Sequence, residues 1–348
     1  MRSAVRTRFV DNGNGLNVHL LEAGEPGRPC VLLLHGFPEL AYSWRKVMPP
    51  LAAAGFHVVA PDQRGYGRTT GWNADYDGEV DSFRLANLAR DAEGLVRALG
   101  LGAVAAVVGH DFGSPVAAYC ALARPEVFRS VVLMSAPFSW TPAPDLSAEL
   151  AALAPPRKHY QWYYSTRAAN EDMWRCAQGV HAFLRAYYHY KSADWPDNRP
   201  HRLASWSAAE LAKMPPYYIM ERSKTMAETV APAMPAAAPS WLPESELAVY
   251  SAEYARTGFQ GGLQWYRCRT EGRNRELEAI TGRPIVVPSM FIAGASDWGV
   301  YQVPGAFEQM QSSVLARLRS SHLVPGAGHW VQQEQPEAVT RLLLEFLG

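Results

Sequence analysis

Residues 107–114 read Val-Val-Gly-His-Asp-Phe-Gly-Ser, and the interpretation of the whole chain depends on this stretch. An apolar run ends at Gly109, a tight turn carries Asp111, and a segment suited to a helix follows Gly113. Strand, turn and helix in this order are typical of a nucleophile elbow, Gly-x-nucleophile-x-Gly, whose glycines permit a strained turn. The nucleophile position holds aspartate, and no Gly-x-Ser-x-Gly occurs in the sequence. The alternative is an ordinary strand–helix turn in which Asp111 caps the helix.

Strand and helix patterns alternate on both sides of this turn. Short apolar runs predict buried strands, and apolar residues at helical spacing predict the helices between them. The predicted strands are residues 5–10, 16–22, 30–35, 56–60, 104–109, 131–135, 289–294 and 322–324, and the predicted helices are 42–54, 81–99, 115–123, 304–310 and 336–346. We therefore expect an α/β fold with a mostly parallel central sheet and helices on both faces.

This alternation is interrupted in the middle of the chain. From residue 137 to about 284 the pattern shows no strand-like repetition, and aromatic-rich helical stretches are separated by proline-rich loops at 137–156 and 232–243. The predicted segments are 1–136 for the first part of the sheet domain, 137–285 for an inserted helical cap, and 286–348 for the second part of the sheet domain. The loop at 232–243 is a candidate gate for an entrance tunnel.

Charge and composition limit the function classes. The 348 residues contain 33 basic and 33 acidic side chains, so the net charge is zero and binding to nucleic acid or to an anionic membrane is not expected. No apolar run reaches the roughly 18 residues of a membrane span, and residues 1–14 lack the apolar part of a signal peptide. Few lysines and many alanines indicate a bacterial genome rich in GC. We expect a small-molecule partner and a monomer or homodimer.

The cysteines indicate the redox compartment. None of the four forms a CxxC pair, which argues against a zinc site and against a disulfide framework. This usage fits the reducing cytoplasm. The four are Cys30, Cys120, Cys176 and Cys268.

Two further polar residues follow later strands in the order expected of a catalytic triad. Asp297 comes shortly after the strand predicted at 289–294, and His329 lies in Gly-Ala-Gly-His-Trp after the last strand. Nucleophile, acid and histidine in this chain order are typical of α/β-hydrolases. A lone histidine beside a tryptophan is more often structural, but three such residues at three strand ends favour a triad.

The loop after the strand at 30–35 completes the candidate site. It reads His35-Gly36-Phe37-Pro38-Glu39, and its position predicts that the Phe37 N–H is one donor of an oxyanion hole. The second donor is the N–H of Phe112, the residue after the nucleophile. The side chains of His35 and Pro38 are expected to shape the loop. We expect His110 to pack or hydrogen-bond.

Four motifs together resemble the soluble epoxide hydrolases of the bacterial and plant type, an α/β-hydrolase family. They are HGFPE (35–39), DQRGYGRT (62–69), GHDFG (109–113) and GAGHW (326–330). Two motifs of the insertion are also similar to that family: HYQWYY (159–164) and GFQGGLQWYR (258–267). The resemblance implies that Tyr160 and Tyr266 are the catalytic tyrosines. The family usually has tryptophan where this chain has Phe112, which leaves the backbone N–H in place but removes an indole donor.

The resemblance implies hydrolysis of an epoxide to a vicinal diol. Asp111, with an ordinary pKa of about 3.9, is ionised at neutral pH and opens the ring by forming an ester. Tyr160 and Tyr266, phenols with an ordinary pKa of about 10, supply the proton to the epoxide oxygen. His329, oriented by Asp297, then activates water to hydrolyse the ester. No metal and no organic cofactor is required.

Substrate contacts are expected from both parts of the chain. Phe37, Gln161, Trp162 and Trp330 are the candidate substrate-binding residues, and a hydrophobic epoxide is the expected substrate. Further aromatic and apolar residues of the insertion could line the cavity or pack within the cap: Tyr163, Trp174, Phe183, Tyr187, Trp206, Tyr217, Met220 and Trp241.

Other function classes remain as alternatives. A haloalkane dehalogenase shares the Asp–His–acid machinery but needs side-chain N–H donors for the halide, which Phe37 and Phe112 lack. A fluoroacetate dehalogenase needs arginines after the nucleophile, where this chain has Phe112 and Ser114-Pro115. A serine esterase or lipase needs serine in place of Asp111. A non-catalytic binding module on the same scaffold would not need the five candidate catalytic residues.

Overall fold

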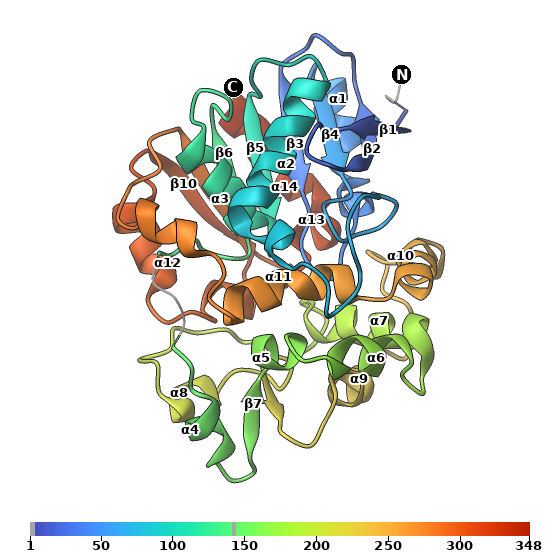
Figure 1. The fold of residues 1–348 in the computed structure, drawn as a ribbon, viewed down its shortest axis with the longest axis vertical. Coiled ribbons are helices and arrows are strands. Elements are labelled where there is room, and N and C mark those ends of the chain that lie inside the picture. The colour runs from blue at the N-terminus through green and yellow to red at the C-terminus, as the bar shows by residue number, and fades with distance from the viewer. Residues whose placement is uncertain (1–3, 141–143) are drawn as a thin grey trace.

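Eight strands form the central sheet of this protein, whose computed structural model describes residues 4–140 and 144–348 (Figure 1). Their spatial order is β1-β2-β4-β3-β5-β6-β9-β10. β1 and β2 pair antiparallel, as do β2 and β4, and all pairs from β4 to β10 are parallel. The strands are β1 Arg6–Asp11, β2 Asn17–Ala23, β3 Cys30–Leu34, β4 His57–Pro61, β5 Ala106–His110, β6 Val131–Met134, β9 Ser289–Gly294 and β10 Leu318–Val324.

Helices cover both faces of the sheet, which explains why its central strands are apolar throughout. Successive side chains of a strand point to opposite faces. In β3, Val31 and Leu33 join one hydrophobic core with α1 and α14, whereas Leu32 and Leu34 join the other with α2 and α3. The helices and short helical turns of this domain are η1 Ala41–Trp44, α1 Met48–Ala53, η2 Asp81–Phe83, α2 Leu85–Ala98, α3 Gly113–Ala123, η5 Trp298–Val300, α12 Ala306–Gln309, η6 Met310–Val314, α13 Val331–Glu334 and α14 Pro336–Leu347.

The predicted fold class is confirmed, but some elements differ from the prediction, and the helix expected at 81–99 is divided into η2 and α2. The helix expected at 42–54 is split into η1 and α1, because Pro49 and Pro50 lack an N–H and are tolerated only in the first turn of a helix. The last strand begins at Leu318 and not at residue 322. Its first residues, Leu-Arg-Ser-Ser, lie half exposed at the edge of the sheet and have no apolar run that could announce a strand.

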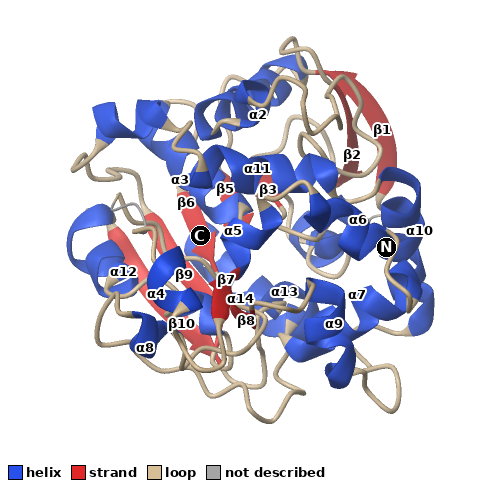
Figure 2. Cartoon of the chain, turned by 60° about the horizontal axis from the view of Figure 1, so that its bottom comes forward, coloured by secondary structure: helices blue, strands red, loops and turns tan. Residues whose placement is uncertain are grey.

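A mostly helical segment separates β6 from β9 and lies below the sheet in Figure 1. Helix α11 lies nearest to the sheet, and Figure 2 views the segment from its free side. Its elements are α4 Ser147–Ala151, β7 Arg157–His159, α5 Tyr160–Tyr164, α6 Ala168–Trp174, α7 Gly179–Tyr190, α8 Ala208–Leu211, β8 Ile219–Glu221, α9 Met226–Val230, η3 Ala231–Ala233, α10 Glu244–Thr257, α11 Gln260–Thr270 and η4 Arg275–Ile280.

The segment contains a small antiparallel sheet that the sequence pattern did not predict. β7 pairs with β8 through His159 and Ile219, and the Tyr160 N–H donates to the Tyr218 carbonyl at 2.9 Å. Three-residue strands are too short for an alternating pattern to be visible. This pairing holds the start of α5, and therefore Tyr160, in place. Among the residues described, none of the helices combines the length and the hydropathy that a bilayer span requires.

Candidate active site

Asp111 lies on a strained turn between β5 and α3. Its φ is 51°, in the left-handed region that non-glycine residues adopt rarely and that costs about 1–3 kcal/mol. The turn is tight enough to require glycine on each side. A Cβ on Gly109 would lie 2.0 Å from the Gly113 carbonyl oxygen, and a Cβ on Gly113 would lie 2.4 Å from the Leu34 carbonyl oxygen. The close packing around the turn therefore holds Asp111 in a strained backbone conformation, and Asp111 lines a cavity beyond the end of β5.

The other two predicted triad members lie beside Asp111. His329 Nε2 is 3.1 Å from Asp111 Oδ2, and His329 Nδ1 is 3.0 Å from Asp297 Oδ1. The same Asp297 oxygen accepts the Gly299 N–H at 2.7 Å, which fixes its rotamer. His329 and Asp297 are each only 1% exposed, and Asp111 is 8% exposed. A histidine between two carboxylates in this geometry can move a proton at the Asp111 side.

Burial and neighbouring charges shift the pKa values of Asp111 and His329 in opposite directions. Burial alone would raise the pKa of Asp111, but the hydrogen bond and charge of His329 outweigh it and hold the pKa of this carboxyl well below its usual value. Burial and the Lys191 ammonium lower the pKa of His329, while Asp297 and Asp111 raise it and prevail. Asp111 is therefore a carboxylate at neutral pH, beside an imidazole whose charged form is favoured.

The loop after β3 supplies a backbone donor to the Asp111 carboxylate. The Phe37 N–H donates to Asp111 Oδ1 at 2.9 Å. Gly36 allows this approach, because a Cβ there would lie 2.4 Å from the Asp111 Cβ. Phe112 is the N-cap of α3, so its N–H lies at the positive end of that helix. Of the two amides expected for an oxyanion hole, the Phe37 N–H thus contacts Oδ1 directly, and the Phe112 N–H stands at the start of the helix that follows Asp111.

Tyr160 and Tyr266 come from different helices and lie in the same cavity as Asp111. Tyr160 begins α5 and Tyr266 lies in α11, and their ring centroids are 5.9 Å apart. Gln161 Nε2 donates to the Tyr160 hydroxyl at 3.0 Å, and that hydroxyl donates to Gln302 Oε1 at 3.1 Å. The Tyr266 hydroxyl has no hydrogen-bond partner within residues 4–140 and 144–348. Burial and the Asp111 charge raise the pKa of the Tyr160 phenol, and burial is also the main cause of the raised pKa of Tyr266.

The cavity above Asp111 has a volume of about 370 Å³. Its wall is mainly apolar and comes from α2, α11, η4 and the segment after β6. Gln161, Gln302 and the two tyrosines supply the polar groups near Asp111, and Arg269 also contributes to the wall. The main apolar residues are Phe83, Leu88, Phe112, Phe138, Trp140, Trp265 and Leu277.

Of the four predicted substrate-binding residues, only one lines the cavity that contains Asp111. Gln161 lines the cavity. Trp162 lines a neighbouring cavity on the other side of Gln161. The Phe37 ring packs against Tyr266 at 5.5 Å and does not line the cavity. Trp330 is buried, with its indole N–H donating to the Tyr188 carbonyl at 2.8 Å.

The other aromatic residues suggested for the wall do not line this cavity. Trp206 lines the neighbouring cavity together with Trp162. Tyr163, Phe183, Tyr187, Tyr217 and Met220 belong to the hydrophobic core, where they pack the helical segment together. Trp174 and Trp241 pack against that core.

A buried carboxylate connects the three loops that form the site. Glu39 accepts the Gly36 N–H at 3.2 Å, lies 2.6 Å from His110 Nδ1, and accepts side-chain N–H groups of Gln332 and Gln333 at 3.0 Å each. His110 Nε2 lies 2.7 Å from the carbonyl oxygen of His329. His110 thus has the hydrogen-bonding role that we expected of it. Glu39 belongs to the HGFPE motif, but its side-chain partners His110, Gln332 and Gln333 come from distant parts of the sequence.

Lys191, just after α7, was not noticed in the sequence. Its side chain is buried, and its Nζ lies 5.2–5.9 Å from the ring centroids of Tyr187, Tyr217, Tyr218 and Trp330. Its carbonyl accepts the His329 N–H at 2.9 Å. The only feature of the sequence that could have drawn attention to Lys191 is its position directly after the tyrosine-rich end of α7. The ammonium adds a positive charge close to the triad.

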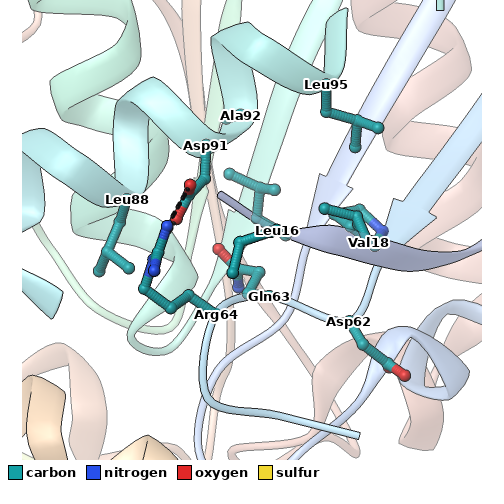
Figure 3. A pocket seen from close by; sticks show the side chains of 11 residues that line it. Leu16, Val18, Asp62, Gln63, Arg64, Leu88, Asp91, Ala92 and Leu95 are labelled. Carbon is teal, nitrogen blue, oxygen red and sulfur yellow. Dashed lines mark hydrogen bonds and ion pairs between the residues drawn. The ribbon is translucent and has the colours of Figure 1, made fainter. Parts of the chain in front are cut away.

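A second hollow lies under β2 and α2, away from the triad (Figure 3). Its volume is about 20 Å³, enough for about one water molecule. Of the charged groups in it, Arg64 and Asp91 bind one another at 2.7 Å, and Asp62 lies 2.7 Å from His19 Nδ1. Elsewhere in the described ranges, no group of three or more His, Cys, Asp and Glu side chains is arranged to hold a metal ion.

Comparison with known proteins agrees with this geometry. The family described as alpha/beta hydrolase fold matches residues 29–336. Epoxide hydrolase A of Mycobacterium tuberculosis is 36% identical, over 98% of this chain and 96% of that protein. The solved structure of an epoxide hydrolase from an endophytic Streptomyces has a TM-score of 0.80 and 34% identity, covering 99% of this chain and 95% of that one. Epoxide hydrolase A from Mycobacterium thermoresistibile has a TM-score of 0.80 and 33% identity, covering 99% and 98%.

Proposed function

Because this chain belongs to the α/β-hydrolase family and is an epoxide hydrolase, we propose that Asp111 is its nucleophile. Asp297 and His329 then hydrolyse the ester that Asp111 forms. One observation carries the assignment: the Asp111 carboxylate lies 3.1 Å from His329 Nε2 and lines the same cavity as Tyr160 and Tyr266. The reaction converts an epoxide and water to a vicinal diol.

Ring opening begins with attack by Asp111 Oδ2 on an epoxide carbon. The C–Oδ2 bond forms as the epoxide C–O bond breaks, and Oδ1 stays against the Phe37 N–H as the carbonyl oxygen of the new ester. The leaving alkoxide takes a proton from a tyrosine. Because burial raises the pKa of both phenols, Tyr160 and Tyr266 are protonated at neutral pH and available as donors.

Ester hydrolysis uses His329 as a base. Esterification removes the negative charge of Asp111, one of the two carboxylates that raise the pKa of His329, so that pKa falls when a base is needed. His329 takes a proton from water, and the hydroxide adds to the Asp111 carboxyl carbon. The amides of Phe37 and Phe112 stabilise the oxyanion on Oδ1. Collapse releases the diol and the Asp111 carboxylate, and the remaining proton returns to the tyrosine.

We propose the same division of the chain that the sequence suggested. Residues 1–136 and 286–348 form the sheet domain with the triad, and residues 137–285 form a cap that brings the two tyrosines. The position of α11 between the sheet and the rest of the cap supports this division (Figure 1). The loop at 232–243 does not line the cavity, so its role as a gate has no support from the lining residues.

A medium-sized hydrophobic epoxide is the proposed substrate. A cavity of about 370 Å³ with a mainly apolar wall falls in the range that holds small organic ligands. Unpaired cysteines support a reducing compartment such as the cytoplasm, and the mycobacterial and Streptomyces relatives support a bacterial source. A monomer or homodimer stays the proposed assembly, which light scattering would measure.

A three-substrate assay tests the proposed function. Wild-type protein should convert styrene oxide to its diol and leave 1-chlorobutane and p-nitrophenyl acetate unchanged. Asp111→Asn is the matched control, because asparagine tolerates the left-handed backbone at this position but is a poor nucleophile. Chloride release from 1-chlorobutane, or diol formation by Asp111→Asn at the wild-type rate, would contradict the proposal.

A further inference from the structure

Arg269 occupies an unusual position in the cavity wall. It lies in the last turn of α11, three residues after Tyr266, so the two side chains are neighbours on the helix surface. It lines the cavity of Asp111 and also the neighbouring cavity of about 250 Å³, and these two share Gln161, Arg269 and Gly272 in their linings. Arg269 therefore stands where the two cavities meet.

The charge of Arg269 is not neutralised by an acidic side chain within residues 4–140 and 144–348. The neighbouring arginines differ in this respect. Arg267 pairs with Glu271 at 3.0 Å, and Arg273 pairs with both Asp81 and Glu271. Arg269 acts on the active site instead, because its positive charge lowers the pKa of the Tyr160 phenol, against the larger effects of burial and Asp111.

The remaining charges around the cavities do not compensate Arg269. Arg275 and Glu278 both line the main cavity and are exposed, so they add one charge of each sign. Asp145 lines the neighbouring cavity and has no ion pair with Arg269. The Asp111 carboxylate is already held by His329. A mainly apolar chamber whose wall includes Arg269 without an ion pair suits a ligand that is apolar along its body and anionic at one end.

We infer that this enzyme prefers epoxides that carry a carboxylate a few carbons from the ring, and that Arg269 binds this carboxylate. The inference rests on the proposed function, because the oxirane must lie between Asp111 and the tyrosines. The backbones of Tyr266 and Arg269 are only about 4.5 Å apart along the helix axis, so we place the carboxylate a few carbons from the oxirane. Arginine binds carboxylates through two parallel N–H···O bonds.

The experiment compares an acid with its own ester. The substrates are 5,6-epoxyhexanoate and methyl 5,6-epoxyhexanoate, and the measured quantity is the ratio of their kcat/KM values. The variants are Arg269→Gln and, as a control with the same change in net charge, Arg129→Gln. Arg129 is exposed and lines neither cavity. Styrene oxide is assayed with every variant as an uncharged reference.

We expect the acid-to-ester ratio to fall about tenfold in Arg269→Gln, mainly through KM for the acid, and to be unchanged in Arg129→Gln. In wild type, raising the salt concentration to 0.5 M should lower the ratio as well, since Arg269 is exposed. An equal ratio in wild type and Arg269→Gln, with styrene oxide still converted, overturns the inference but not the proposed function. Loss of turnover on all three epoxides in the wild type overturns both.

Discussion

Replacement of Tyr266 by phenylalanine should slow ring opening more than the same change at Tyr160. The Tyr266 hydroxyl has no hydrogen-bond partner in the described part of the chain and is free to meet the epoxide oxygen. The Tyr160 hydroxyl lies 3.1 Å from Gln302 Oε1 and must give up this bond before it donates to substrate. The two phenols are therefore unequal donors, although both line the cavity.

The size of the difference follows from these contacts. Removal of one preorganised donor to a developing oxyanion slows the chemical step roughly 10²–10³-fold. The bond to Gln302 that Tyr160 exchanges is worth about 1 kcal/mol. That free energy corresponds to about fivefold in rate. We expect Tyr266→Phe to slow alkylation about fivefold more than Tyr160→Phe.

The alkylation rate is measured directly in a His329→Gln background, which cannot hydrolyse the ester. Stopped-flow tryptophan fluorescence follows single turnovers, since Trp265 packs against Phe112 at a centroid distance of 5.2 Å. Tyr164→Phe is the matched control, because Tyr164 lies on α5 and its hydroxyl contacts only that of Tyr187, at 3.3 Å. Equal slowing by the two catalytic variants would refute the reasoning, as would a loss of the same size in the control.

Three further predictions concern the second half-reaction and its supports. The low pKa of Asp111 keeps it ionised at about pH 5, so alkylation should continue there, whereas ester hydrolysis should slow because Asp297 still favours the charged form of His329 in the ester. Quenched-flow mass spectrometry should then show more adduct than at pH 8, and equal adduct at both pH values would argue against this. Lys191→Met removes a cation that lowers the pKa of His329, so the acid limb of the pH profile of kcat should move to higher pH. A move to lower pH would disprove the electrostatic role of Lys191. Glu39→Gln weakens the charge-assisted hydrogen bond to His110 and should lower the free energy of unfolding, measured in urea titrations, by about 2 kcal/mol. A decrease below about 0.5 kcal/mol would show that the buried carboxylate is dispensable for stability.

The fold was predictable because its signals are local. Apolar runs such as the one that becomes β3 are continuous, since both faces of the strand are buried. Asp111, Asp297 and His329 each lie within five residues after the end of a strand, and parallel strands bring their carboxyl ends to one edge of the sheet. Strand order therefore brings them together from distant parts of the sequence.

The cavity wall was less predictable, because it depends on how the helical segment between β6 and β9 packs against the sheet. Trp162 and Trp206 are aromatic residues of this segment but line the neighbouring cavity. Phe138 and Trp140, in a loop without periodicity, line the cavity above Asp111. No spacing in the sequence distinguishes a tyrosine such as Tyr187, which packs in the core, from Tyr266, which lines the cavity.

Long-range polar contacts were also beyond the reach of sequence patterns. Glu39 contacts Gln332 and Gln333 almost three hundred positions away. Lys191 reaches the triad only because the end of α7 lies against the loop of His329, whose N–H it binds. Such pairs arise from tertiary packing and leave no periodic signal in either segment.

A single turnover in H₂¹⁸O tests the central claim, the covalent ester on Asp111, most directly. Enzyme in excess over epoxide is allowed to react once, and both the diol and the peptide that contains Asp111 are analysed by mass spectrometry. Because water attacks the carboxyl carbon of the ester, the account predicts that ¹⁸O appears in the Asp111 carboxylate and that the first diol formed contains none. Label in the diol with an unlabelled Asp111 would show that water attacks the epoxide directly, and would contradict the account.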